Sequence, residues 1–426
     1  MVHLDGFQVA GKENLVCKLI KSLYGLEQSP RQWYLKFDSF MIKNGYTGSA
    51  MDHFYGSRTF GVKNNGVASH AKNDIDADSL LNSWKDACQS GGTVSVPEGT
   101  YLIDPVQFSG PCNGQVTFQL DGTLQAPPGK IDAPEWIKFS NVDGLVIQGS
   151  GTLDGQGESA WPGHCLGCDP LTTSLTLSAV NNGHIQDITS LNSKGFHIKI
   201  INGGGTTVEH VNITAPEDSP NTDGIHTSDT SNINILNSNI GTGDDCISMG
   251  GGSQNINITG VSCGPGHGIS IGSIGKNTND SSVSGVHVSS CTMTNTENGV
   301  RIKTYTSDCA ATISDVTFQN ITVDQSQNPI IIDQNYCGGH ETCSGNSHVK
   351  VSDVKFIGVQ GTSATPVAVK LDCSSEIPCE EITLDTINIS LGSGGDATSS
   401  CSNVKVQYNG PQSPSPCSNS LHHQHL

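Results

Sequence analysis

Short apolar runs recur along the chain from residue 184 onward. In these runs Ile, Val or Phe alternate with polar residues, and their starting positions lie 23 to 38 residues apart. The runs are 184–188, 208–213, 233–235, 256–258, 286–288, 316–318 and 354–356. Such alternation is typical of a strand with one buried face. Repeated at this period in an Asn- and Gly-rich chain, it predicts an all-β fold, a parallel β-helix in which each coil stacks on the last.

The composition narrows the fold class further. Glycine makes up 50 of 426 residues, aromatic residues are 5% and charged residues 14% of the chain. The apolar pattern excludes a disordered chain, and the lack of long Leu, Ala, Glu and Lys stretches excludes a helical protein. No apolar run reaches the roughly 18 residues of a membrane-spanning helix, so we expect no membrane partner.

Four short clusters carry the candidate chemistry. They are Asn-Thr-Asp-Gly at 221–224, Gly-Asp-Asp at 243–245, Gly-His-Gly at 266–268 and Arg-Ile-Lys at 301–303. Asp223 and Asp244 are 21 residues apart, and Asp244 and His267 are 23 apart, which matches the shorter repeat spacings. Because strands of neighbouring coils lie about 4.8 Å apart, we expect these three residues to share one face, together with Asp245.

The residue types in these clusters indicate a reaction class. Carboxyl groups can protonate a glycosidic oxygen and activate a water. Arg301 and Lys303 are two residues apart and therefore point to the same side of a strand, where an Arg fork and a Lys charge suit a carboxylate. The clusters together predict a hydrolase for an anionic polysaccharide.

Several of these residues also have a purely structural interpretation. An Asp in an Asn- and Gly-rich coil usually bonds to its own backbone in a turn, but three clustered carboxylates favour catalysis. We interpret His226 and His287 as surface or structural histidines. His267 is retained as a candidate because flanking glycines allow a ligand or the backbone to approach closely.

The first 58 residues do not share the repeat. Leu-Tyr-Gly-Leu at 23–26 and Gln-Ser-Pro-Arg-Gln-Trp-Tyr at 28–34 make residues 6–46 resemble a reverse transcriptase segment of copia-type retrotransposons, with Glu27 in place of the usual Lys. This stretch is far shorter than a polymerase domain. We therefore predict that 1–58 is a reverse-transcriptase-like fragment without a domain of its own, and that 59–426 forms the β-helix domain.

The charge distribution separates the same two parts. Residues 1–60 hold seven Lys or Arg and five Asp or Glu, a net charge of +2, whereas the rest holds 14 basic and 35 acidic residues, a net charge of −21. The negative charge of residues 61–426 repels nucleic acid at long range, so we expect no nucleic-acid partner.

Cysteine usage indicates an oxidising compartment. Beyond Cys17 the chain holds 14 cysteines, an even number that predicts disulfides. Three candidate pairs are Cys246 with Cys263, Cys373 with Cys379, and Cys401 with Cys417. Cys165 and Cys168 have zinc-ligand spacing, but no matching second pair follows, so a disulfide is favoured there over a metal site.

Targeting signals give a mixed picture. Five Asn-x-Ser/Thr sequons, consistent with a secreted glycoprotein, begin at Asn212, Asn257, Asn279, Asn320 and Asn388. Residues 1–20 lack the continuous apolar core of a signal peptide, because Asp5, Lys12 and Glu13 interrupt it. No signal peptide is evident in this chain.

Taken in order, the four clusters are similar to the four motifs of plant polygalacturonases of glycoside hydrolase family 28, and the resemblance extends from about residue 59 to the C-terminus. The flanking residues that match include Gly-Thr-Leu-Asp-Gly-Gln-Gly at 151–157, Ser219-Pro220, Gly224-Ile225-His226, Cys246 and Gly264-Pro265. The resemblance implies a right-handed, single-stranded parallel β-helix. It also implies hydrolysis of α-1,4-linked galacturonan in pectin with inversion, no metal or other cofactor, and secretion to the cell wall. We expect a monomer.

Members of this family usually begin with a short strand and a helix that caps the first coil. The segment 77–88 fits this helix, because Leu80, Leu81, Trp84 and Ala87 are spaced three and four apart. With its open end covered in this way, the β-helix domain is expected to fold without residues 1–58.

The resemblance also implies roles for single residues. Asp244 is the expected general acid, Asp223 and Asp245 hold and activate the water, and His267 tunes the protonation of the acid. The substrate-binding residues are expected to be Asn221, Arg301, Lys303 and Tyr336.

Two other interpretations stay open. One is a related enzyme on the same scaffold, a pectate lyase or a rhamnogalacturonan hydrolase, although a lyase would need a calcium cluster and a basic proton abstractor. The other is a catalytically silent, wall-binding or allergen-like β-helix.

Overall fold

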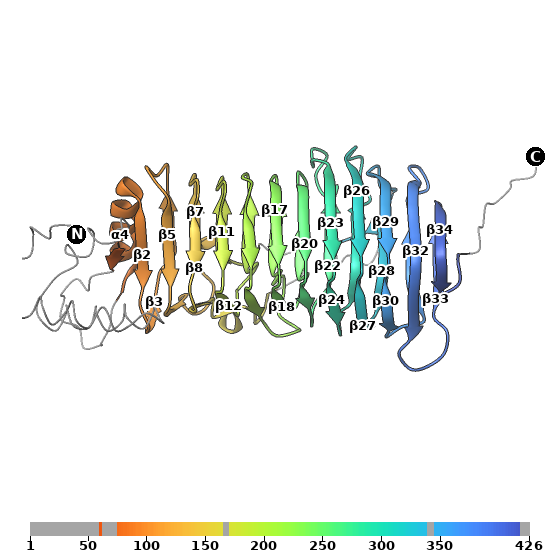
Figure 1. The fold of residues 1–426 in the computed structure, drawn as a ribbon, viewed down its shortest axis with the longest axis horizontal. Coiled ribbons are helices and arrows are strands. Elements are labelled where there is room, and N and C mark those ends of the chain that lie inside the picture. The colour runs from red at the N-terminus through yellow and green to blue at the C-terminus, as the bar shows by residue number, and fades with distance from the viewer. Residues whose placement is uncertain (1–58, 62–74, 165–169, 339–344, 418–426) are drawn as a thin grey trace, which may run out of the picture. The chain divides into compact units, whose positions relative to one another are not determined.

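The computed structural model of the chain describes residues 59–61, 75–164, 170–338 and 345–417. The predicted reverse-transcriptase-like fragment at 1–58 lies outside the described residues, as do Cys165 and Cys168. Nearly all regular elements of the described part are parallel strands, which stack coil upon coil along one axis (Figure 1). The predicted parallel β-helix is therefore confirmed.

The strands form three ladders, and each regular coil contributes one strand to each ladder. The first ladder contains β1 (Thr59–Gly61), β2 (Gly92–Val96), β5 (Val116–Leu120), β8 (Val146–Gln148), β11 (His184–Gln186), β14 (Thr207–Glu209), β17 (Ser231–Leu236), β20 (Gln254–Thr259), β23 (Val283–Ser289), β26 (Thr312–Gln319), β29 (Lys350–Ile357), β32 (Cys379–Leu391) and β34 (Val404–Ser413). The second contains β3 (Thr100–Leu102), β6 (Thr123–Gln125), β9 (Thr152–Asp154), β12 (Thr189–Leu191), β15 (Asn212–Thr214), β18 (Asn239–Gly241), β21 (Ser262–Cys263), β24 (Thr292–Thr294), β27 (Thr322–Ser326) and β30 (Gln360–Ser363). Both ladders pair with β32 and so belong to one sheet of 23 strands.

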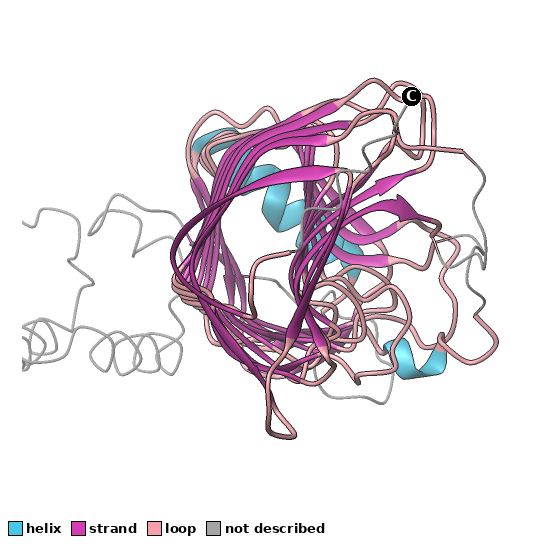
Figure 2. Ribbon diagram, turned by 90° about the vertical axis from the view of Figure 1, so that its right-hand side faces the viewer, coloured by secondary structure: helices cyan, strands magenta, loops and turns pink. Residues whose placement is uncertain are grey.

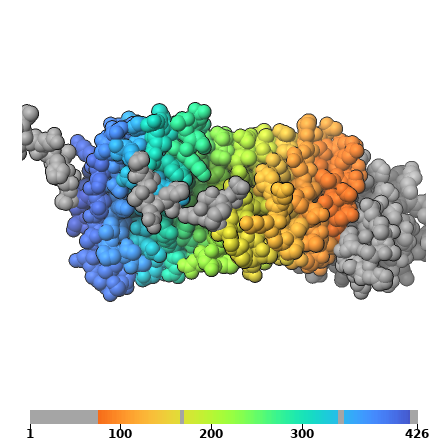
Figure 3. Space-filling model, turned by 180° about the vertical axis from the view of Figure 1, so that it is seen from behind, coloured from red at the N-terminus to blue at the C-terminus, as the bar shows by residue number. Residues whose placement is uncertain are grey.

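The third ladder is a separate sheet of 11 strands. It contains β4 (Val106–Ser109), β7 (Glu135–Ser140), β10 (Thr173–Ser178), β13 (Ile198–Ile201), β16 (Ile225–Ser228), β19 (Ile247–Met249), β22 (Ile269–Ile274), β25 (Asn298–Tyr305), β28 (Asn328–Tyr336), β31 (Val367–Asp372) and β33 (Thr398–Ser402). A 3-10 helix, η2 (Gly157–Ser159), lies in the connection between β9 and β10. Seen from behind, the coils follow one another as bands in sequence order (Figure 3).

The core consists of apolar side chains that stack in register from coil to coil. The repeated runs of the sequence supply one such row, which contains Ile185, Val208, Ile235, Ile258, Val288, Phe318 and Phe356. All seven side chains are buried. Each contributes about 1.5–3 kcal/mol by leaving water, so the repeat that signals the fold in the sequence also stabilises it.

One residue per coil makes the bend between the first and second ladders. It has a positive φ in coil after coil, at Asp187, His210, Asn237, Gly260, Ser290, Asn320 and Gly358. Asn, Asp and Gly adopt this backbone conformation most readily. The Asn and Gly content of the repeat is therefore explained by its turns.

Helix α4 (Ala77–Ser90) covers the first coil, as Figure 2 shows in a view along the stack. Asp76 caps its N-terminus by accepting a hydrogen bond from the backbone N–H of Ser79 at 2.8 Å. Leu80, Trp84 and Ala87 of the predicted apolar face are buried, and Leu81 is half-buried. Trp84 packs against Phe108 and Phe139 of the first coils. The predicted capping helix is thus confirmed and extends two residues beyond Cys88. No helix in the described ranges is long and apolar enough to span a membrane.

The disulfides agree in part with the cysteine count. Cys246–Cys263, Cys373–Cys379 and Cys401–Cys417 form as predicted, and Cys88–Cys112 joins α4 to the loop after β4. Cys291 and Cys309 are buried and unpaired. The even number of cysteines therefore overstated the pairing, since at least two thiols pack in the core as small apolar side chains.

Candidate active site

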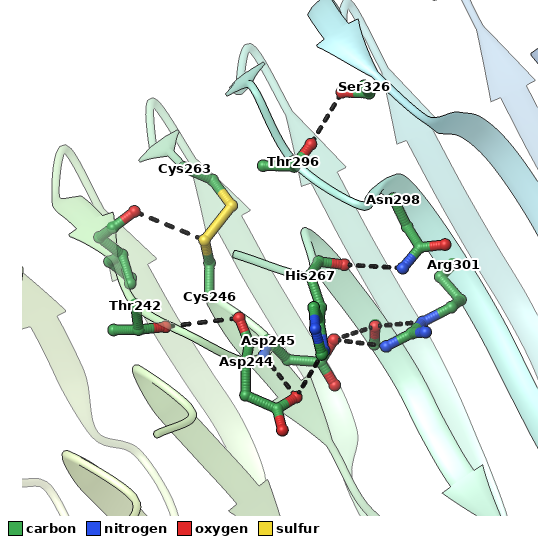
Figure 4. The surroundings of a disulfide bond; sticks show 12 residues. Thr242, Asp244, Asp245, Cys246, Cys263, His267, Thr296, Asn298, Arg301 and Ser326 are labelled. Carbon is green, nitrogen blue, oxygen red and sulfur yellow. Dashed lines mark hydrogen bonds and ion pairs between the residues drawn. A yellow bond between two sulfur atoms is a disulfide. The ribbon is translucent and has the colours of Figure 1, made fainter. Parts of the chain in front are cut away.

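The four clusters predicted from the sequence meet on the 11-stranded sheet. Asp223 precedes β16, the Asp244-Asp245 pair precedes β19, and His267 precedes β22. Arg301 and Lys303 lie on β25, and these four strands are consecutive neighbours in the sheet. Because equivalent positions of successive coils are adjacent in space, residues up to 80 positions apart are brought to one site, part of which is shown in Figure 4.

Asp245 forms the buried anionic centre of the site. Its Oδ1 accepts hydrogen bonds from Arg301 Nη2 at 2.8 Å and from Ser270 Oγ at 2.6 Å, and its Oδ2 accepts one from Lys303 Nζ at 2.8 Å. Burial raises the pKa of Asp245, but the Lys303 and Arg301 charges outweigh it and hold the pKa well below its ordinary value. Asp245 is therefore ionised throughout the ordinary pH range and cannot supply a proton.

Asp244 is the more accessible of the two adjacent carboxyl groups. Its side chain is 17% exposed, against 2% for Asp245. Oδ1 is held by the backbone N–H of Asp245 at 2.7 Å and by His267 Nδ1 at 3.0 Å. Among the described residues, Oδ2 has only a long contact of 3.4 Å from Asn221 Nδ2. This arrangement leaves Oδ2 available to a ligand in the site.

His267 lies between two carboxyl groups. Its Nδ1 faces Asp244 Oδ1, and its Nε2 lies 3.2 Å from Glu297 Oε2. Burial lowers the pKa of His267, but the hydrogen bond to Asp244 and the charges of Asp244 and Glu297 outweigh it, so the pKa is raised. Because its pKa is raised, His267 holds a proton up to a higher pH than an ordinary histidine. This proton lies beside the accessible carboxyl group of Asp244.

Steric constraints require glycine on either side of His267. Gly266 and Gly268 both have positive φ. A Cβ on Gly266 would press on the backbone oxygen of Asp244, and one on Gly268 would overlap that of Asn298. The two glycines therefore let neighbouring backbones come close enough to place the imidazole on Asp244.

Asp223 has one occupied and one free oxygen. Its Oδ2 accepts a hydrogen bond from Ser248 Oγ at 2.6 Å, and no donor among the described residues lies on Oδ1. Burial and the charges of Asp244 and Asp245 raise its pKa well above the ordinary value, although the Ser248 bond and the Lys303 charge act in the opposite direction. Asp223 is thus a buried carboxyl that accepts a proton readily.

The predicted substrate-binding residues line the same site. Arg301 also donates through Nε to Ser270 Oγ at 3.0 Å, and Lys303 Nζ lies 5.2 Å from the ring centroid of Tyr336. Tyr336 in turn meets Tyr305 edge-on, with centroids 5.2 Å apart. Asn221 is exposed beside Asp244. The structure therefore brings together all eight residues named from the sequence.

Five further residues of the site were missed in the sequence. They are Ser248, Ser270, Glu297 and Tyr305, together with His226, which the sequence suggested was a surface or structural histidine. His226 bonds to Ser248 with Nδ1 and Oγ 2.7 Å apart, a contact that is compatible with a structural histidine. The strand register of the structure identifies the two serines, because Ser248 pairs with Ser270, and Ser270 with Arg301, on adjacent strands.

The site offers a weak set of metal ligands. Asp244, Asp245 and His267 each have one ligand atom within 4.8 Å of the others. The charge of Asp245, however, is already matched by two cations at 2.8 Å, which would repel a metal ion. The residues present fit proton transfer beside a fixed anion better than metal binding.

Comparison with known proteins gives a consistent result. Residues 88–413 match the family model of the glycosyl hydrolases of family 28. The chain is 43% identical over 366 residues to an exopolygalacturonase of Platanus acerifolia, covering 83% of this chain and 95% of that one. It is 45% identical over 352 residues to an exopolygalacturonase of Oenothera organensis, covering 80% and 97%. A polygalacturonase of Gossypium hirsutum is 42% identical over 371 residues, covering 84% and 89%.

Solved structures share the fold. An endo-xylogalacturonan hydrolase of Aspergillus tubingensis superposes with a TM-score of 0.70 at 26% identity, covering 83% of this chain and 100% of that one. A polygalacturonase of Erwinia carotovora superposes with a TM-score of 0.65 at 25% identity, covering 81% and 100%.

Proposed function

This chain belongs to the glycosyl hydrolases of family 28, and we propose that it hydrolyses the α-1,4-galacturonosidic bonds of pectic galacturonan with inversion. The observation that carries this proposal is the grouping of three carboxyl groups with Arg301 and Lys303 on consecutive strands. The relatives called polygalacturonases support the same substrate.

Asp244 is the general acid in this proposal. Its Oδ2 is the accessible carboxyl oxygen, and its Oδ1 is fixed by His267 and by a backbone N–H. The proton of Asp244 passes to the glycosidic oxygen as the bond from that oxygen to the anomeric carbon breaks. A protonated His267, 3.0 Å away, returns a proton to Asp244 after each turnover.

Asp223 is the general base. Its free Oδ1 takes a proton from a water as the water oxygen bonds to the anomeric carbon from the opposite face, which gives inversion. The raised pKa of Asp223 makes it a stronger base than an ordinary carboxylate. Asp245 stays ionised, orients Arg301 and Lys303, and has an acceptor position left on Oδ2 to hold the water.

Arg301 and Lys303 hold the galacturonate carboxylate. Residues 61–426 carry a net charge of −21, which by itself repels an anionic polymer. Placing two cations beside the reacting carboxyl groups supplies local attraction and favours an acidic sugar over a neutral one. Asn221 and the ring of Tyr336 contact the same sugar.

The position of cleavage is proposed from the relatives. Two of those most similar to this chain are called exopolygalacturonases, which supports removal of galacturonate from chain ends. In a digest of polygalacturonate, monogalacturonate would then appear from the first minutes while the viscosity falls slowly. An early fall in viscosity with mixed oligomers would point to internal cleavage instead.

The cellular setting follows from the same family. The disulfides are consistent with the secretory pathway, and we place the protein outside the cell, in the plant cell wall, acting as a monomer on homogalacturonan without a nucleic-acid partner. Residues 1–58 take no part in catalysis in this proposal.

The alternative is a catalytically silent, wall-binding β-helix, and the digest of polygalacturonate distinguishes it from a hydrolase. It predicts that the purified protein binds polygalacturonate without releasing reducing ends. The complete set of acid, base and cationic residues in one site argues against it, because a binding surface has no need of a buried carboxyl with a raised pKa.

A further inference from the structure

We propose that His226 and Ser248 form a hydrogen-bonded chain that positions Asp223, with Ser248 donating directly to the carboxylate and His226 acting through Ser248. This inference rests on the function proposed above and adds two positioning residues to it.

The direction of the chain follows from counting protons. Ser248 Oγ lies 2.6 Å from Asp223 Oδ2 and donates its single proton there. The same Oγ lies 2.7 Å from His226 Nδ1. Since the hydroxyl proton is already used, Ser248 accepts at this second contact, and His226 must carry its proton on Nδ1.

The strand register holds His226 in place. It lies on β16 directly opposite Ser248 of β19 and, on the other side, opposite Lys199 of β13. Its ring stacks on Phe196 with centroids 4.9 Å apart and planes at 28°. Ser248 itself is 2% exposed. Neither donor can therefore turn away from Asp223 without breaking a packed contact.

Burial, assisted by two nearby positive charges, keeps His226 neutral. Burial lowers its pKa to about 4, assisted by the positive charges of Lys199 and Lys303 and opposed by Asp245. Above that pH the imidazole is uncharged and serves as a constant Nδ1–H donor. Asp223 itself faces Asp244, Asp245 and Lys303, so the chain is one of few influences that favour its ionised form.

A second chain of the same design lies one coil away. Ser270 donates to Asp245 at 2.6 Å, just as Ser248 donates to Asp223, and each serine follows its aspartate by 25 residues. Behind Ser270, however, stands the charged donor Arg301, whose Nε lies 3.0 Å from Oγ. The hydrogen-bonded chain to Asp223 thus ends in a neutral histidine, and Asp223 has a raised pKa. The chain to Asp245 ends in a permanent cation, and Asp245 stays ionised.

The kinetic test uses single and double variants of the two donors. Ser248→Ala removes a hydrogen bond to the ionised form of Asp223, so the acidic limb of kcat/KM should move to higher pH by about one unit, with KM little changed. His226→Leu should move it in the same direction by less, because Ser248 can still donate. The double variant should match Ser248→Ala alone, since His226 acts only through the serine.

Two further variants serve as controls. His226→Asn keeps an N–H donor close to the position of Nδ1 and should restore the wild-type pH limb. His287→Leu changes an exposed histidine on β23 and should leave the profile unaltered. Additive effects of His226→Leu and Ser248→Ala, or a fall in rate without movement of the acidic limb, would overturn the proposal.

The hydrogen bonds from His226 through Ser248 to Asp223 can also be tested by a measurement that does not depend on enzymatic activity. In the wild-type full-length protein, the imidazole ¹⁵N shifts should show His226 as the neutral Nδ1–H tautomer above about pH 5. An Nε2–H tautomer would refute the chain whether or not the protein hydrolyses galacturonan. An Nδ1–H tautomer in a protein that releases no sugar would instead count against the proposed reaction and leave the hydrogen-bonded chain standing.

Discussion

Arg301 donates to Asp245 across 56 residues of sequence, with Nη2 and Oδ1 2.8 Å apart. Asp245 lies before β19 and Arg301 on β25, two strands further along the sheet. Together with Lys303 this contact gives Asp245 a fixed negative charge beside two fixed positive ones. Among the three clustered aspartates, Asp245 is therefore the one that the proposed mechanism does not use for proton transfer.

Asp245→Asn tests this arrangement. The change leaves Arg301 and Lys303 buried without their countercharge, which costs about 3–5 kcal/mol when one partner of a buried pair is lost. We expect a lower midpoint in denaturant unfolding and loss of sugar release. Asp104→Asn, at an exposed aspartate between β3 and β4, is the control and should change neither. An Asp245→Asn protein as stable as wild type would show that the ion pairs are not formed in solution.

Glu297→Gln tests the raised pKa of His267. Because Glu297 raises the pKa of His267, the change should lower that pKa and move the alkaline limb of kcat to lower pH. The stability that His267 gains from its partners is fully present below its unfolded pKa of about 6.5. It is lost as the pH rises through the raised folded value, so the variant should also lose stability at a lower pH than wild type. An alkaline limb that stays in place, or moves upward, contradicts the role given to His267.

The Cys246–Cys263 disulfide should support the catalytic carboxyl groups directly, because Cys246 follows Asp245 (Figure 4). Replacing both cysteines by Ala opens a loop with a sequence separation of 17 residues and should cost about 3 kcal/mol, with a fall in kcat. The matched control is Cys373–Cys379, separated by 6 residues, which should affect stability less and kcat not at all. Equal effects of the two changes on kcat would refute a local role for the first disulfide.

Deleting residues 1–58 should leave sugar release intact. Helix α4 already covers the first coil through Leu80, Trp84 and Ala87, so we expect the core to stay covered after the deletion. The measurement is the specific activity and melting temperature of the 59–426 chain beside the full chain. A truncated chain that is insoluble or inactive would show that the N-terminal segment contributes to the domain.

The fold could be predicted because its signal is local and repeated. Each apolar run of the first ladder recurs often enough to fix the stacking, and α4 shows its own apolar spacing. The three aspartates, the histidine and the two cations of the site could be named from motifs. Ser248, Ser270 and Glu297 could not, since their importance depends on which side chain lies beside them one or two coils away. The contact of His226 with Ser248 likewise depends on the neighbouring coil. The cysteine count could not reveal that Cys291 and Cys309 pack unpaired in the core.

The most direct test of the proposed function is reducing-sugar release from polygalacturonate by the purified chain and by its Asp244→Asn variant. Loss of a general acid typically costs a factor of about 10² to 10⁴ in rate, so we predict robust release by the wild type and a fall of at least about a hundredfold in the variant. The variant should fold as the wild type does, because the Asp244 side chain is partly exposed and Asn can keep its hydrogen bonds. A folded wild type that releases nothing, or a variant as active as wild type, would contradict a hydrolase that uses Asp244 as its acid.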